Sequence, residues 1–322
     1  MIKMSNKESI NGILAFGTSV LIWSIIYIAT NPVLGLFPKG PLSYNFSPGS
    51  YQGLGFSIAA ELAIFLTLLG LYYLKVNVKF RTLLVPLALV NVGILLGMVG
   101  TTAFMWYLGP SSSSMGGMMG TPPTNVGMAE VGFIGFLIAG IGLLFSSIYL
   151  VYLGFKSNVK FPIWFKYIFF FGPFLMLLTL PIMLAAEVWN LFLQSSMVPM
   201  SMVPISYGII SMLYWPGGTM VFTLAYYSLF QAFGLIYLVV SKLNVGFNEK
   251  NAILGMYLFS AGIVLSLVTN GIGTWISSWT PPSWLVNLTQ GIGLLSIASV
   301  VAGGLVNIGN IIFYTLKTKV QI

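Results

Sequence analysis

Long apolar runs dominate the sequence and allow very few folds. A helix needs about 20 mostly apolar residues to cross a membrane, and eight runs reach that length. They cover residues 12–33, 53–75, 82–107, 129–154, 167–191, 218–240, 252–275 and 287–315. Charged residues make up only 6% of the chain, whereas a soluble domain carries about 25%. We therefore predict one all-α polytopic membrane domain, residues 1–322, with about eight transmembrane helices in contact with lipid.

The positive charges fall almost entirely on one side of this predicted topology. Of the 13 Lys and Arg residues, only Lys39 lies in a connection of the opposite side. Because Lys and Arg near span ends are retained in the cytoplasm, we predict a multi-pass plasma-membrane protein with both termini cytoplasmic. We expect the first run to be a retained span, not a cleaved signal peptide. The cations are scattered at helix ends, so we expect them to set topology and not to bind nucleic acid.

Several residue types are missing, and their absence excludes many cofactors. The chain has no Cys, His or Asp. Cofactors held through His or Cys are therefore excluded within it, as are catalytic triads with a His base. With few general bases left, a catalyst acting alone is the least favoured function. An exterior almost without charge also fits an acidic habitat, and we expect a thermoacidophilic, archaeal source.

The predicted outer loops have a composition of their own. These loops are residues 34–52, 108–128, 192–217 and 276–286, rich in Pro, Gly, Ser, Met and aromatic residues. Closely spaced methionines occur at Met115, Met118, Met119, Met197, Met200 and Met202. Thioethers suit Cu(I), although methionines also form adaptable contact surfaces for partners. Asn45 begins an Asn-Phe-Ser glycosylation sequon.

A six-residue pattern recurs in the three basic turns. Lys75–Phe80, Lys156–Phe161 and Lys242–Phe247 share the frame Lys-x-Asn-Val-x-Phe, each one helical hairpin after the last. A duplicated helical hairpin explains this pattern, and so does convergence of basic turns on similar residues. Both explanations stay open.

Small and polar residues form stripes along two predicted spans. In residues 129–154 the stripe consists of Gly132, Gly135, Ala139, Gly142 and Ser146. In residues 287–315 it consists of Ser296, Ser299, Gly303, Asn307 and Asn310. Such stripes allow helices to approach closely and to form interhelical hydrogen bonds, and we expect mainly this role.

Carboxyl groups inside the spans are the strongest candidates for function. Glu61, with Ser57 one turn before it, lies about eight residues from the outer end of the second run, roughly 12 Å deep. Glu187 shares a helix face with Asn190 in the fifth run, and Glu130 begins the fourth. An acid inside a membrane is a functional candidate by default. The alternative is a protonated carboxyl hydrogen-bonded to a neighbouring helix.

The hydropathy pattern and Glu61 together resemble two groups of proteins. One comprises haem-free hydrophobic subunits of archaeal respiratory complexes, which accompany a secreted cytochrome or a terminal oxidase. The other is the quinone-binding membrane subunit of polysulfide-reductase type. The resemblance implies that Glu61 faces a quinone headgroup.

Two function classes follow. The first is a non-catalytic membrane subunit that anchors an extracytoplasmic cytochrome or oxidase subunit on its outer loops and contacts quinone near Glu61. The second is a transporter of protons, a small solute or Cu(I). Its path would be lined by Glu61, Tyr227, Gln231, Asn270 and Asn307.

Overall fold

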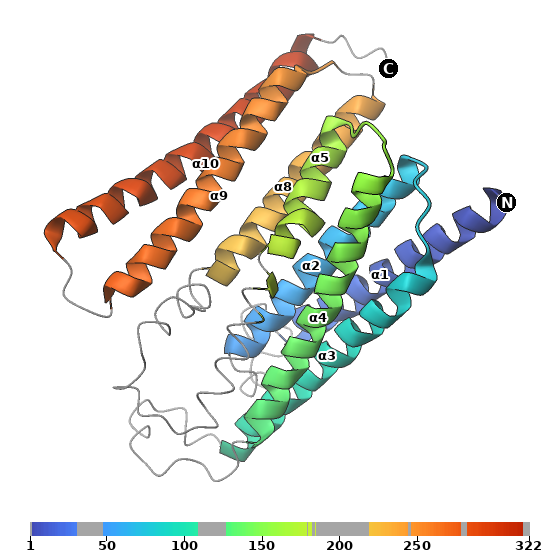
Figure 1. Ribbon diagram of the computed structural model, residues 1–322, viewed down its shortest axis with the longest axis vertical. Coiled ribbons are helices and arrows are strands. Elements are labelled where there is room, and N and C mark those ends of the chain that lie inside the picture. The colour runs from blue at the N-terminus through green and yellow to red at the C-terminus, as the bar shows by residue number, and fades with distance from the viewer. Residues whose placement is uncertain are drawn as a thin grey trace. The chain divides into compact units, whose positions relative to one another are not determined.

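The computed structural model is helical throughout the part of the chain that it describes. That part comprises residues 2–30, 48–108, 127–178, 180–181, 184, 219–243, 246–277 and 282–317. Its helices are α1 (Ile2–Thr30), α2 (Pro48–Tyr73), α3 (Phe80–Leu108), α4 (Gly127–Lys156), α5 (Ile163–Phe169), the π-helix η3 (Phe170–Phe174), α8 (Thr219–Lys242), α9 (Glu249–Ser277) and α10 (Ser283–Lys317) (Figure 1). The prediction of an all-α fold is therefore confirmed for these residues.

Among the described residues, five helices are long and apolar enough to cross a membrane. The qualifying segments are Lys7–Ala29, Leu54–Tyr73, Phe80–Gly100, Ile134–Lys156 and Ser283–Tyr314. Many of their large apolar side chains are exposed, such as Leu294 at 68% and Leu21 at 65%. This surface is compatible with a membrane protein in contact with lipid. Each of the eight predicted runs overlaps a helix, but the count of eight spans stays a prediction.

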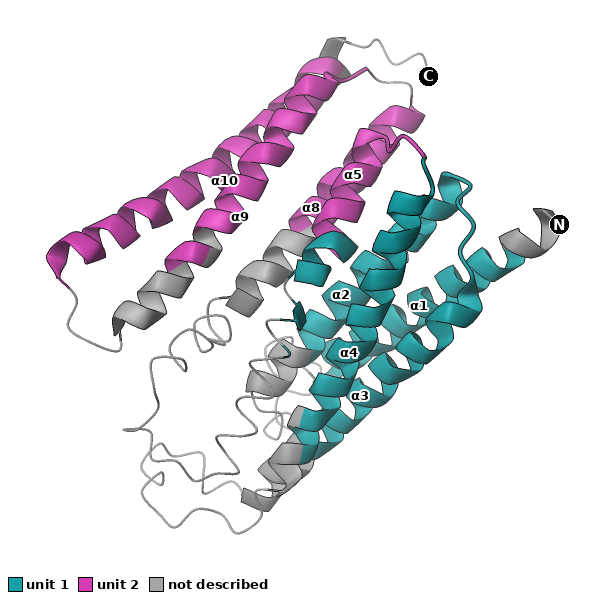
Figure 2. Ribbon diagram, viewed as in Figure 1, with its two compact units in different colours: residues 1–158, 173–196 teal, residues 159–172, 197–322 magenta. Residues whose placement is uncertain are grey.

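The chain forms two compact units (Figure 2). Unit 1 comprises Met1–Asn158 and Pro173–Ser196, and it contains α1 to α4. Unit 2 comprises Val159–Gly172 and Met197–Ile322, and it contains α5, α8, α9 and α10. The fifth predicted run is not one regular α-helix, because Gly172 (φ −109°, ψ −105°) breaks it within η3. Pro173 follows, and proline removes a backbone donor and kinks helices.

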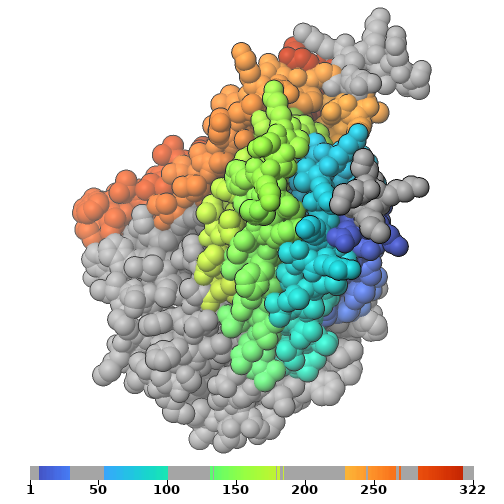
Figure 3. Space-filling view, turned by 45° about the vertical axis from the view of Figure 1, so that its right-hand side comes forward, coloured from blue at the N-terminus to red at the C-terminus, as the bar shows by residue number. Residues whose placement is uncertain are grey.

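In unit 1, α3 and α4 pack backbone against backbone. A Cβ added at Gly142 would lie 2.5 Å from the Pro86 carbonyl oxygen, and one at Gly135 would strike the backbone of Gly97. The small stripe on α4 therefore faces α3, as its spacing predicted, and the two helices run beside each other in space-filling view (Figure 3). The expected packing role of this stripe is confirmed.

Hydrogen bonds gather the basic segments of unit 1 at one end. The Ser9 hydroxyl of α1 accepts a bond from the Val78 backbone N–H at 3.2 Å, which joins the start of α1 to the turn after α2. The Lys79 backbone N–H in that turn donates to the Tyr149 hydroxyl of α4 at 2.9 Å. Tyr149 lies two turns before Lys156, so three basic segments share this end, as the predicted topology requires.

In unit 2, too, hydrogen bonds join segments that contain lysines at one end. The Asn248 backbone N–H, in the turn between α8 and α9, donates to Asn310 Oδ1 of α10 at 3.0 Å. The Tyr167 hydroxyl of α5 donates to the Ala252 carbonyl of α9 at 2.9 Å. The start of α5, the start of α9 and the C-terminal part of α10 therefore lie together, each near lysines. The assignment of this end to the cytoplasm stays a prediction.

Two copies of the recurring turn pattern have different backbones. In the first copy Lys75, at the first position, has φ 57°, and in the second copy Asn158, at the third position, has φ 50°. Lys75 is the left-handed residue of a Schellman motif that ends α2, with Val76 N–H bonded to Leu71 O at 2.9 Å. The copies share sequence but not conformation, so duplication of a hairpin stays a prediction.

Candidate functional site

Glu61 lies near the middle of α2, completely buried inside unit 1. The helix begins at Pro48, but its apolar segment begins at Leu54, close to the predicted start of the span at residue 53. Ser57, one turn before it, is also buried, at 3% exposure. The two residues thus lie on one buried face of α2.

The Glu61 carboxyl group lies beside Ser19 of α1. The Ser19 hydroxyl donates to Asn91 Oδ1 on α3 at 3.1 Å. Within the described part of the chain, neither Glu61 oxygen has a hydrogen-bond partner of acceptable geometry. A buried carboxyl group without partners is energetically costly, which makes this position a candidate for ligand or proton binding.

The polar cluster next to Glu61 satisfies itself. Asn91 Oδ1 also accepts a hydrogen bond from Trp23 Nε1 at 2.9 Å, and Asn91 Nδ2 donates to the Leu87 carbonyl at 3.0 Å. An amide oxygen has two lone pairs, so Ser19 and Trp23 fill its acceptor capacity. The cluster therefore joins α1 to α3 through the Asn91 amide.

The α2 face between Glu61 and the basic end is apolar. Ile64 and Leu71 are completely buried, and the Leu68 side chain is 1% exposed. Thr67, the polar residue among them, donates to its own helix at the Ala63 carbonyl, 2.7 Å away. Along this face of α2, no polar group leads from the carboxyl towards the basic turn.

A second buried polar group occupies unit 2, centred on Asn307 of α10. Asn307 Oδ1 accepts hydrogen bonds from the hydroxyl groups of Tyr167 on α5, at 2.8 Å, and Tyr237 on α8, at 2.7 Å. Asn307 Nδ2 donates to the Gly303 carbonyl of its own helix at 2.8 Å. Gly255 on α9 makes room for this amide, because a Cβ there would overlap the Asn307 side chain.

Asn310 extends this network to the turn between α8 and α9. Its Nδ2 donates to the Asn248 carbonyl at 3.0 Å and lies 3.3 Å from the Tyr237 hydroxyl. Aromatic rings surround the network, including Phe230, which stacks on Phe171 with centroids 3.6 Å apart. Because its donors and acceptors are paired with one another, the network holds four helices together.

Gln231 of α8 is buried in unit 2 but stands apart from this network. Its Nε2 donates to the Ile168 carbonyl at 3.4 Å, and its Oε1 has no hydrogen-bond partner in the described residues. The structure shows no bond between Gln231 and Asn307, the two proposed path residues whose side chains it describes in this unit. A continuous polar path through them is not seen.

The remaining predicted site residues lie outside the description. The side chains concerned are those of Glu187, Asn190, Tyr227, Asn270, Asn45, Met115, Met118, Met119, Met197, Met200 and Met202. The quinone, Cu(I) and glycosylation hypotheses that involve them therefore stay predictions.

Sequence reasoning missed the partners of the buried amides. Tyr167 and Tyr237 were not singled out, nor were Asn91 and Trp23. An Asn in the middle of a span requires hydrogen-bond partners, so the position of Asn91 in the sequence indicates an interhelical contact.

No protein-family model, curated protein or solved structure matches the chain.

Proposed function

We propose that the chain is a non-catalytic membrane subunit of a respiratory electron-transfer complex, in which Glu61 contacts a quinone headgroup. The observation that supports this proposal is the buried Glu61 carboxyl group, which has no hydrogen-bond partner among the described residues. A protonated carboxyl group can donate a hydrogen bond to a quinone carbonyl oxygen. A carboxylate can accept a proton from the corresponding quinol.

The surroundings of Glu61 favour this proposal over transport. A transporter requires polar groups that continue across the membrane, whereas Ile64, Leu68 and Leu71 fill the α2 face towards the basic end. Glu61 is therefore better suited to a binding site that a ligand reaches from one side only. Transport of protons, a small solute or Cu(I) remains the alternative function.

The second part of the proposal concerns the partner. We propose that the Met- and Trp-rich outer loops anchor an extracytoplasmic cytochrome or oxidase subunit. This part is supported by composition, since Met and aromatic residues are adaptable contact residues.

The test begins with purification of the native complex in a mild detergent. Haem-containing subunits should accompany the chain and give a cytochrome absorption spectrum. Quinol-driven cytochrome reduction is then measured with a short-chain naphthoquinol. We expect Glu61→Gln to lower the rate by at least about tenfold while the haem content per chain is unchanged.

Glu249→Gln is the matched control, because Glu249 is exposed at the start of α9. It should leave the rate unaltered. A chain that purifies alone without haem would argue against the electron-transfer assignment. Full activity of Glu61→Gln in an intact complex would remove Glu61 from the quinone site.

A further inference from the structure

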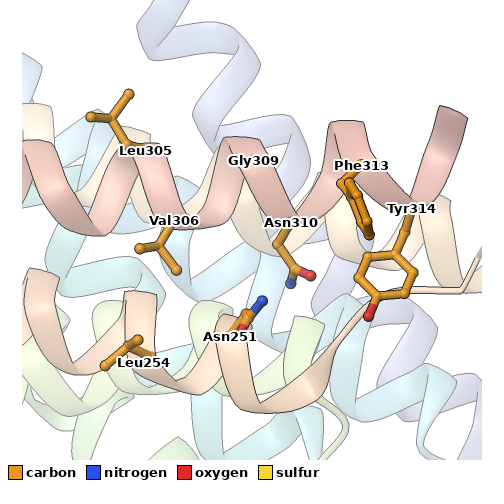
Figure 4. Close-up of a pocket in the computed structure, with 8 residues that line it drawn as sticks. All are labelled: Asn251, Leu254, Leu305, Val306, Gly309, Asn310, Phe313 and Tyr314. Carbon is orange, nitrogen blue, oxygen red and sulfur yellow. The ribbon is translucent and has the colours of Figure 1, made fainter.

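An open groove lies between α9 and α10 near the basic end of unit 2. It has a volume of about 390 Å³ and is lined by residues of the first turns of α9 and the last turns of α10 (Figure 4). This volume is within the range of about 300–1,000 Å³ that is common for small-molecule sites. Glu61, the proposed quinone contact, is not one of the lining residues, so the groove requires a separate explanation.

The two helices are in close contact at some glycines of α9 and α10 but not at Gly309. Elsewhere the helices touch: a Cβ at Gly262 would lie 2.5 Å from Val300 Cγ2, and one at Gly303 would lie 3.1 Å from the Phe259 backbone nitrogen. At Gly309, by contrast, an added Cβ would meet nothing within 4 Å. Gly309 is one of the lining residues, and its lack of a side chain leaves space in the groove.

The lining changes character along the helices. Leu254, Val306 and Phe313 are apolar, whereas Asn251 and Tyr314 provide polar groups. In the close-up, Asn251 lies opposite Asn310, and Tyr314 lies beside Phe313 (Figure 4). The groove therefore offers both apolar and polar contacts.

Two exposed charged residues, Glu249 and Lys250, lie in the first turn of α9 next to the lining residue Asn251. Lys250 is exposed and lies one helical turn before Leu254, hence on the same face of α9. The apolar rim is also exposed, with Leu254 at 49%, Leu305 at 64% and Phe313 at 53%. In a membrane these rim residues face hydrocarbon, so the groove opens sideways to lipid while its basic end faces the headgroups.

We propose that this groove binds one anionic phospholipid of the inner leaflet. An acyl chain lies along Leu254, Val306 and Gly309, and the phosphate group lies near Lys250 and Asn251. Basic pockets between helices on the cytoplasmic side are suited to anionic headgroups, and the lysine supplies the complementary charge. The Asn310 amide also lines the groove. Its Nδ2 group is already bonded to Asn248 and Tyr237, so it does not bind the phosphate group.

Native mass spectrometry of the full chain in dodecyl maltoside tests this proposal. Phosphatidylglycerol and phosphatidylcholine with identical acyl chains are added separately, and lipid adducts are counted. Wild type should retain one phosphatidylglycerol more strongly than phosphatidylcholine. Gly309→Trp fills the groove and should lose this preference, and Lys250→Gln should reduce it by weakening phosphatidylglycerol alone.

Gly291→Trp is the matched control, because Gly291 is also on α10, lies outside the groove and has nothing within 4 Å of an added Cβ. It should bind both lipids as wild type does. Gly309→Leu replaces the tryptophan variant if that variant does not fold. Equal retention of phosphatidylglycerol by wild type and the Gly309 variants would overturn the proposal, as would equal retention of the two lipids by wild type.

Discussion

The Asn307 side-chain oxygen lies 2.8 Å from the hydroxyl group of Tyr167, a residue 140 positions earlier in the chain. Tyr237 donates to the same oxygen at 2.7 Å. One amide thereby joins α5, α8 and α10 within unit 2. Because all three groups are buried, each hydrogen bond avoids the energetic cost of leaving a polar group unpaired in an apolar environment.

Asn307→Ala should destabilise the chain by about 1–3 kcal/mol, since two buried phenol hydroxyl groups lose their shared acceptor. The measurement is the free energy or midpoint of unfolding of the full chain in detergent. Asn287→Ala is the control, because Asn287 is exposed on the same helix. Equal stability of the two variants would show that the tyrosines find other partners.

Glu61→Met should have the opposite effect and stabilise the fold. The substitution keeps the length of the side chain and removes a buried carboxyl group that lacks hydrogen-bond partners among the described residues. Removing such a polar group should contribute about 1–3 kcal/mol. The thermal midpoint should rise, while quinol-driven activity is lost. A lower midpoint would mean that Glu61 is held by a partner in the folded chain.

The features that the sequence predicted are those encoded by local periodicity. Gly132, Gly135 and Ala139 recur at helical spacing, and this spacing alone shows which face of α4 can meet another backbone. The burial of Ser57 and Glu61 follows similarly from their positions one turn apart in an apolar run. Helix ends were less accurate, as with α2, whose polar first turn lies outside the apolar run.

The features that were missed depend on which helices are neighbours. Nothing in the residues around Tyr167 indicates that Asn307 will meet it, because that contact is decided by the packing of α5 against α8, α9 and α10. The break at Gly172 and Pro173 is different. A Gly-Pro pair within a span is a local signal for a kink, and the prediction of a single fifth span did not use it.

Lys75→Gly should stabilise unit 1 by about 0.5–1 kcal/mol. Lys75 has φ 57°, a left-handed conformation that costs about 1–2 kcal/mol for a residue with a Cβ, and glycine relieves most of that cost. Lys79→Gly is the control, because it removes one positive charge from the same turn without relieving a positive φ. Lys79→Gly should lower the unfolding midpoint and Lys75→Gly should raise it. Parallel changes in the two variants would show that charge, not backbone conformation, determines the effect.

The predicted orientation in the membrane can be tested by cysteine labelling, because the natural chain contains no cysteine. Single substitutions Met118→Cys and Lys160→Cys are placed in a predicted outer loop and a predicted cytoplasmic turn. In intact cells a membrane-impermeant maleimide should label only Met118→Cys, and after permeabilisation it should label both variants. Lys79→Cys is a second inner position, since Lys79 shares the basic end of unit 1 with Tyr149. Labelling of Lys160→Cys in intact cells would show that the orientation in the membrane is the reverse of the predicted one. It would then place the basic ends of both units, and the lipid groove beside Lys250, at the outer surface.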